Sequence, residues 1–155
     1  MSVKMSQAFA AFRSSLLAEL QNQISNDLAH QFNAELEDIR KKDGEHQVYI
    51  ALLRSEGKET AAVKMEELAN KEQKARLLDL QLRRQQFILE LNTKMHDAID
   101  QRVADYGGKV AEIHEPIIGG KEVAPRKIKK AQFSDGSMAK VPGQLWIDYS
   151  LFQTL

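Results

Sequence analysis

The sequence contains no cysteine. This absence excludes disulfide bonds, thiolate catalysis and zinc sites built from cysteine, and it fits a reducing compartment. Aromatic residues make up only 6% of the 155 residues and hydrophobic residues 43%, which is lean for a compact enzyme. No stretch approaches the roughly 18 apolar residues that a membrane-spanning helix needs, and the first residues lack the apolar region of a secretory signal. These absences predict a soluble protein made in the cytoplasm, with no membrane association.

Proline is absent before Pro116 and glycine is absent before Gly44. In the stretch before Gly44, apolar residues recur every three or four positions, which predicts one long helix over residues 6–42. The average step, about 3.75 residues, is longer than the 3.5 of a heptad coiled coil and favours a nearly straight or right-handed bundle. Ser25–Asp27 offers an internal cap, but the stripe continues through it without a change of phase. The stripe residues expected to pack helices together or to contact a partner are Phe9, Phe12, Leu16, Leu20, Ile24 and Leu28.

Two glycines punctuate the next part of the chain. Asp43-Gly44 is a turn pair, so we expect the first helix to fold back at 43–45. Gly57 predicts a kink or break between a short helix at 45–56 and a long one at 59–105, which Gly107-Gly108 ends. In the long helix Ala61, Leu68, Ala75, Leu82 and Leu89 follow one another at heptad spacing. Apolar residues lie all around its middle, which indicates more than one neighbour, contributed by further copies or a partner chain. The residues expected to form this central layer at an oligomer or partner interface are Leu78, Leu82, Phe87 and Leu89.

Residues 109–155 form a C-terminal arm of different character, which contains all three prolines. We expect extended segments at 110–118 and 122–133, a hairpin that turns at 134–137 onto 138–141, and a final strand at 145–152 with alternating side chains. Two interpretations stay open: an arm that docks onto a partner, and a self-contained β-meander. In either case the expected anchors are Trp146, Ile147, Tyr149 and Phe152, because exposed aromatic residues serve well at interfaces.

Residues with reactive side chains do not form a recognisable active site, metal site or cofactor site. His96 and Asp100 have the i, i+4 spacing of two metal ligands, but no third ligand joins them in sequence. Gly119-Gly120-Lys121 lacks the first glycine and the Ser or Thr of a phosphate-binding loop. The sequence therefore predicts no catalytic residue, no metal and no cofactor.

A short basic run interrupts the arm. Four cations stand in five residues, and they suit either phosphate contact or a solvated edge strand: Arg126, Lys127, Lys129 and Lys130. Over the whole chain Lys and Arg balance Asp and Glu at 22 each, so no net field attracts nucleic acid.

These patterns together predict a mainly α-helical protein. Residues 1–108 would form an elongated helical hairpin or coiled-coil-like bundle, and residues 109–155 an extended or small β arm. Helical patterning is shared by many unrelated proteins and implies no particular family. We expect a non-enzymatic structural or assembly protein that forms homo-oligomers through its stripes and docks its arm onto a protein partner, as in a larger particle such as a phage virion or a secretion machine. The alternative is a dimeric nucleic-acid-binding regulator or adaptor that uses residues 126–130.

Overall fold

The computed structural model describes residues 3–114 and 127–155. The protein is mainly helical, with a small antiparallel sheet near its C-terminus, as the sequence predicts. The elements in chain order are α1 (Met5–Asn22), the π-helical η1 (Gln23–Leu28), α2 (Ala29–Ser55), α3 (Glu59–Asp105), β1 (Lys109–His114), β2 (Lys127–Gln132), β3 (Met138–Lys140) and the 3₁₀-helical η2 (Tyr149–Leu151). They form two compact units, and the division does not follow the expected boundary at residue 108. Unit 1 contains Met1–Asn22 and Leu89–Ile147, and unit 2 contains Gln23–Ile88 and Asp148–Leu155.

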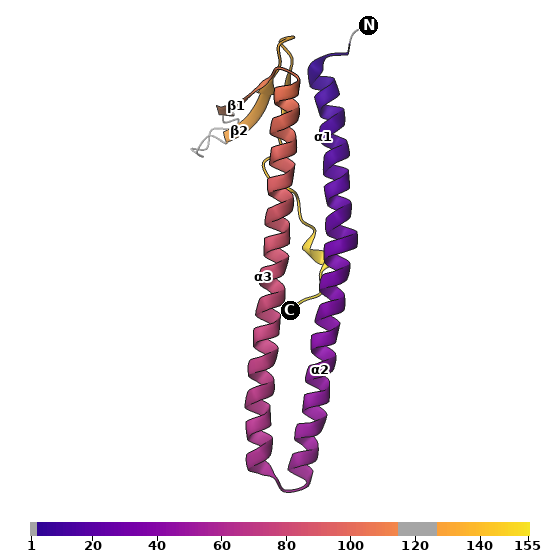
Figure 1. The fold of residues 1–155 in the computed structure, drawn as a ribbon, viewed down its shortest axis with the longest axis vertical. Helices are drawn as coiled ribbons and strands as arrows, with labels where there is room; N and C mark the ends of the chain where they lie inside the picture. The colour runs from indigo at the N-terminus through magenta and orange to yellow at the C-terminus, as the bar shows by residue number, and fades with distance from the viewer. Residues whose placement is uncertain (1–2, 115–126) are drawn as a thin grey trace, which may run out of the picture. The chain divides into compact units, whose positions relative to one another are not determined.

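Unit 2 is a helical hairpin whose turn lies at Gly57. In Figure 1, α2 and the first part of α3 run side by side in opposite directions from this turn. Gly57 has φ +74°, a conformation that glycine adopts without steric cost. The Gly57 N–H donates to the Arg54 carbonyl and the Lys58 N–H to the Leu53 carbonyl, which is the Schellman pattern that ends a helix.

The turn expected at Asp43-Gly44 is wrong, because α2 continues through both residues. The buried positions of α2 show why. Leu28, Ile39 and Ile50 are spaced by eleven residues, and this series crosses Gly44 without a change of phase. Beyond the crossing, Ile50 and Leu53 pack with Ala62 and Ala69 of α3, and this cluster closes the end of the hairpin.

The same spacing occurs in α3, where Ala69 and Leu80 are also buried and eleven residues apart. Eleven residues over three turns give about 3.67 residues per turn. Ala62 and Ala69 are also buried and are seven residues apart, so the buried face contains both spacings, and the departure from heptad packing stays a prediction.

The predicted helix 6–42 is continuous, but it contains the π-helical turn η1 between α1 and α2. Residues 23–28 widen into a π-helix at the point where Ser25–Asp27 offered a cap. The buried stripe passes through η1, with Ile24 and Leu28 both covered. Insertion of a wider turn lets a helix change its phase without ending.

Unit 1 contains α1, the end of α3 and the three-stranded sheet in the order β1-β2-β3. Phe9 of α1 is fully buried, and its ring lies 5.5 Å from that of Phe133. Gly107 ends α3 with φ +68° in a second Schellman pattern. The next residue, Gly108, has no space for a side chain, because a Cβ atom there would stand 2.8 Å from the ring of Phe133. The predicted end of the helix and the hairpin onto 138–141 are thus both confirmed.

The turn between β2 and β3 also caps α1. The Met5 N–H donates to Asp135 Oδ2 at 2.8 Å, and the Ser6 N–H donates to Ser137 Oγ at 3.0 Å. A carboxylate at a helix N-terminus satisfies free N–H groups and faces the positive end of the helix dipole. Arg13 then donates to the carbonyl of Lys140 at 2.6 Å. The hairpin is therefore fixed to α1 through its own turn residues.

The final strand expected at 145–152 is wrong, because the chain forms η2 there. The Asp148 side chain accepts a hydrogen bond from the Ser150 N–H at 3.0 Å and thereby closes a local turn. Only Leu145 and Phe152 of this stretch are buried, seven residues apart. Of the other expected extended segments, β1 and β2 cover the described parts of 110–118 and 122–133, and residues 115–126 lie outside the described chain. Within the described residues, no helix is long and apolar enough to cross a membrane.

Candidate interaction surfaces

The part of α3 in unit 2 carries a second apolar face that the hairpin leaves uncovered. Leu68 is 62% exposed, Leu78 57% and Leu82 54%. Leu68 and Leu82 follow the heptad series read from the sequence, together with the exposed Ala61 and Ala75, and Leu78 lies three residues after Ala75. Leu78 and Leu82 lie outside the face that this hairpin buries, which includes Ala69 and Leu80, and their expected role at an oligomer or partner interface stays a prediction. We call Ala61, Leu68, Ala75, Leu78 and Leu82 the outer stripe of α3.

The two remaining residues expected in the central layer have different surroundings. Phe87 is half-buried and lines a pocket between α2 and α3 with Leu28 and Leu80. Leu89, which belongs to unit 1, is 61% exposed. The stripe of the first helix, in contrast, is inside the protein. Phe9, Leu20, Ile24 and Leu28 are buried, and Phe12 and Leu16 are half-buried.

A smaller apolar patch on α2 was not foreseen as a surface. Val48, Tyr49 and Leu52 are all about half exposed or more, on the side of α2 away from the buried Ile50 and Leu53. We call these three residues the tip patch. The sequence gives one signal for it: these residues do not lie in the eleven-residue series of Leu28, Ile39 and Ile50. That series can be recognised only if the helix is taken to continue through Gly44.

The last residues of the chain lie in a groove of unit 2. Asn33 of α2 holds their main chain with both ends of its amide. Its Nδ2 donates to the Leu151 carbonyl at 2.9 Å, and its Oδ1 accepts from the Gln153 N–H at 2.7 Å. Two helical turns further along α2, Arg40 donates to the Gln153 side chain at 2.9 Å and to the Thr154 carbonyl. We call residues 148–155 the C-terminal segment.

Phe152 stands between the two main-chain groups that Asn33 binds, and it is the one residue of the C-terminal segment that is buried. Its ring meets Phe32, and the Arg84 guanidinium lies over the rings of Phe32, Phe152 and Tyr149 at 4.8, 5.3 and 5.6 Å. Burial of such a ring contributes about 2 kcal/mol, and each cation–π contact adds roughly 0.5–1 kcal/mol at a partly exposed site. The groove is therefore selective for an aromatic side chain.

The other expected anchors of the arm are less covered. Trp146 is 73% exposed, and Tyr149 is 59% exposed apart from its contact with Arg84. Ile147 is half-buried in unit 1. Of the four expected anchors, Phe152 is therefore the one that this chain buries itself, and a role of the other three at an interface stays a prediction.

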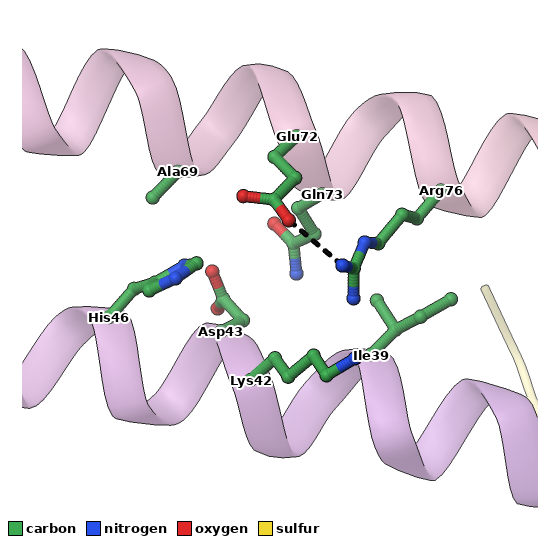
Figure 2. A pocket seen from close by; sticks show the side chains of 8 residues that line it. All are labelled: Ile39, Lys42, Asp43, His46, Ala69, Glu72, Gln73 and Arg76. Atoms are coloured by element: carbon green, nitrogen blue, oxygen red, sulfur yellow. Dashed lines mark ion pairs between the residues drawn. The ribbon is translucent and has the colours of Figure 1, made fainter.

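A polar hollow lies between α2 and α3 near the middle of unit 2 (Figure 2). Figure 2 shows the His46 ring directed toward the Asp43 carboxylate on α2, with Glu72 and Gln73 extending from α3 on the opposite side. Arg76 pairs with Glu72 at 2.9 Å on the same helix, and Asp43 Oδ1 is buried with no hydrogen-bond partner. The hollow is partly open to solvent, and the space that it offers to water is about 10 Å³, enough for about one molecule that can hydrate Asp43.

His96 and Asp100, the metal-like pair of the sequence, lie in unit 1. The His96 Nε2 atom is hydrogen-bonded to the Gly143 carbonyl, and the neighbouring Asn92 accepts the Leu145 N–H at 2.7 Å. This edge of α3 therefore fixes residues 143–145 to the helix. Among the described residues, no three His, Asp or Glu side chains are grouped so that they could hold a metal ion.

The basic run falls on β2, which is the middle strand of the sheet rather than an edge strand. Arg126 and the side chain of Lys127 lie outside the described chain. Lys129 and Lys130 point to opposite faces because side chains alternate along a strand. Glu112 stands directly across from Lys129 in the register. Lys130 stands directly across from Lys140 of β3. The face of Lys130 therefore carries two neighbouring lysines, whereas the face of Lys129 pairs its lysine with a carboxylate.

Comparisons with protein-family models, with curated proteins and with solved structures found no match to this chain.

Proposed function

We propose that this protein is a non-enzymatic assembly component that forms homo-oligomers through the outer stripe of α3. The observation that carries the proposal is that α3 has two apolar faces, of which its own hairpin covers one. Leu68, Leu78 and Leu82 are each more than half exposed, while Ala69 and Leu80 on the other face are almost fully buried. A helix with two apolar stripes is suited to two helical neighbours.

A second copy of the chain fits the outer stripe for two reasons. Four of its five residues, Ala61, Leu68, Ala75 and Leu82, have heptad spacing, and the two alanines allow two helices to approach closely. Charges of both signs border it, including Glu67, Lys74 and Asp79, and the chain as a whole has equal numbers of acidic and basic residues. Two copies therefore meet without net repulsion and can pair charges along the rims. Membership of a larger particle remains a prediction from the sequence.

The test is a mass measurement by light scattering at micromolar concentration. The wild-type chain of 17.6 kDa should give the mass of two or more subunits. The triple variant Leu68→Gln, Leu78→Gln and Leu82→Gln should give the mass of one subunit with an unchanged helical circular dichroism spectrum, because glutamine favours helix and these side chains make few internal contacts.

The tip patch provides the matched control. The double variant Val48→Gln and Leu52→Gln changes residues of similar exposure on α2 and should leave the oligomer intact. A wild-type protein of one-subunit mass at every concentration tested would overturn the proposal. An oligomer that the tip-patch variant dissolves, and the outer-stripe variant does not, would also overturn it.

A further inference from the structure

The C-terminal segment binds its groove in the way that a helical surface binds a separate peptide. The groove is formed by Phe32, Asn33, Arg40 and Arg84, all on the helices of unit 2. The bound residues are Tyr149 to Thr154, and Asn33 pairs with main-chain groups on both sides of the buried Phe152. None of these contacts depends on a covalent link between groove and segment. The same contacts can form when the two belong to different chains.

The segment has few buried apolar contacts with its groove. Phe152 is its single buried side chain, and Tyr149, Ser150, Leu151 and Thr154 are exposed. Elements with few buried apolar contacts open locally much more often than the whole protein unfolds. A groove that opens often can accept another occupant when one is present at high local concentration.

The path of the chain favours such an exchange. Residues up to Ile147 belong to unit 1, whereas the segment from Asp148 packs within unit 2. Hydrogen bonds with His96, Asn92 and Gln21 hold Gly143, Leu145 and Trp146 to the helices of unit 1. The connection to the segment is therefore Ile147 and Asp148, which form neither helix nor strand. A segment that follows an irregular connection can be exchanged between identical chains.

We infer that, within the assembly, the groove of one copy takes residues 148–155 of a second copy. This inference rests on the proposed function, because only an assembly keeps a neighbouring segment close to the groove. The occupant is a second copy because residues 149–154 already match the groove, with an aromatic ring between two main-chain groups that Asn33 pairs with.

The absence of cysteine makes a direct test possible. One protein carries Glu37→Cys, on the exposed face of α2 one turn before Arg40, and another carries Thr154→Cys. The two are mixed, left to equilibrate and treated with a short bifunctional maleimide. Exchange predicts a covalent heterodimer. Addition of Phe152→Ala to the Thr154→Cys chain should lower its yield at least tenfold.

Two controls define the result. A Glu56→Cys chain, with its cysteine at the hairpin turn instead of beside the groove, should give no heterodimer with Thr154→Cys. If Phe152→Ala lowers the helical circular dichroism signal, the test uses Asn33→Ala in the Glu37→Cys chain instead. Asn33→Ala removes only the two hydrogen bonds to the main chain of the segment. A heterodimer yield unchanged by either groove variant would overturn the inference.

Light scattering on the same samples separates this inference from the proposed function. In one outcome the protein is an oligomer, the mixture gives no heterodimer, and a chain that carries both cysteines cross-links only within itself. This outcome overturns the exchange and leaves the outer stripe as the assembly surface. One-subunit mass together with internal cross-links alone overturns both. An oligomer whose mixture gives the Phe152-dependent heterodimer supports both.

Discussion

The ring of Phe152 meets the ring of Phe32 edge to face, with centroids 5.3 Å apart and planes at 81°. This contact joins the C-terminal segment to the most buried aromatic residue of α2. Replacement of Phe152 by alanine should therefore release the segment at a local cost of about 2 kcal/mol. The measurement is hydrogen exchange at the Gln153 amide, which donates to Asn33. We expect its exchange rate to rise roughly thirtyfold, since 1.4 kcal/mol corresponds to about tenfold.

Trp146 provides the control for this prediction, because it is larger than Phe152 but largely exposed. Trp146→Ala should change stability by less than about 0.5 kcal/mol and leave the Gln153 amide protected. Equal exchange rates at Gln153 in the two variants would show that Phe152 does not hold the segment.

Asp135 makes unit 1 sensitive to acid. Hydrogen bonds from the Ser137 side chain, and then from the Met5 and Ser137 N–H groups, hold the pKa of Asp135 below its ordinary value of 3.8. A carboxylate with a lowered folded-state pKa stabilises the fold above its unfolded pKa, and this contribution is lost as the pH falls through the folded pKa. Denaturant unfolding at pH 6 and pH 3 should therefore show a smaller acid loss in Asp135→Asn than in wild type.

Asp97→Asn is the matched control for the acid experiment, because Asp97 is an exposed carboxylate of α3 in the same unit. Its acid loss should equal that of the wild type. If Asp135→Asn also loses as much stability as wild type between the two pH values, the cap of α1 does not titrate as described.

Arg83 links the two helices of unit 2 through a two-point ion pair with Glu35. Its Nη2 lies 2.7 Å from Glu35 Oε2, and its Nη1 donates to Oε1 at 3.1 Å. The hydrogen bond to Glu35 is the main reason that the pKa of Arg83 is raised. Because Arg83 is about half exposed, solvent screens the pair, and a double-mutant cycle with alanine should give a coupling of about 0.5–1 kcal/mol at low salt.

Salt provides the check on that coupling, which should fall clearly at about 1 M salt, where the screening length is about 3 Å. The exposed pair Lys42 and Asp38 on α2 is the comparison, and it should give a smaller coupling at either salt concentration. A coupling between Arg83 and Glu35 that is zero at low salt would contradict the prediction.

The sequence predicted α3 to its first and last residues because both ends are marked by a glycine that must adopt positive φ. The sequence-based prediction placed the turn of the hairpin wrongly, at Asp43-Gly44 instead of Gly57. Asp43-Gly44 and Gly57 are both acceptable turn sites locally, and the choice depends on which apolar residues face each other after the chain has turned. Ile50 and Leu53 reach Ala62 only if the chain turns at Gly57.

The candidate surfaces show a similar limit. Leu78, Leu80 and Leu82 are equally apolar, yet only Leu80 is buried. A helix with two apolar stripes offers either one to its own hairpin, and the spacing of the facing helix decides between them. The prediction of a last strand was wrong for a local reason. The Asp148 side chain accepts a hydrogen bond from the Ser150 N–H and forms a turn in a stretch whose side chains alternate as in a strand.

Gly44 and Gly57 test the position of the turn with the same substitution in two places. Gly44 lies inside α2 with open space around it, so Gly44→Ala should stabilise the protein by about 1 kcal/mol through helix propensity. Gly57 has φ +74°, so Gly57→Ala should destabilise it by about 1–2 kcal/mol although no atom obstructs the new Cβ. Thermal or denaturant unfolding of the two variants measures both effects. If the chain turned at Gly44 instead, the two signs would be exchanged, because alanine would then be strained at residue 44 and favourable in a helix at residue 57.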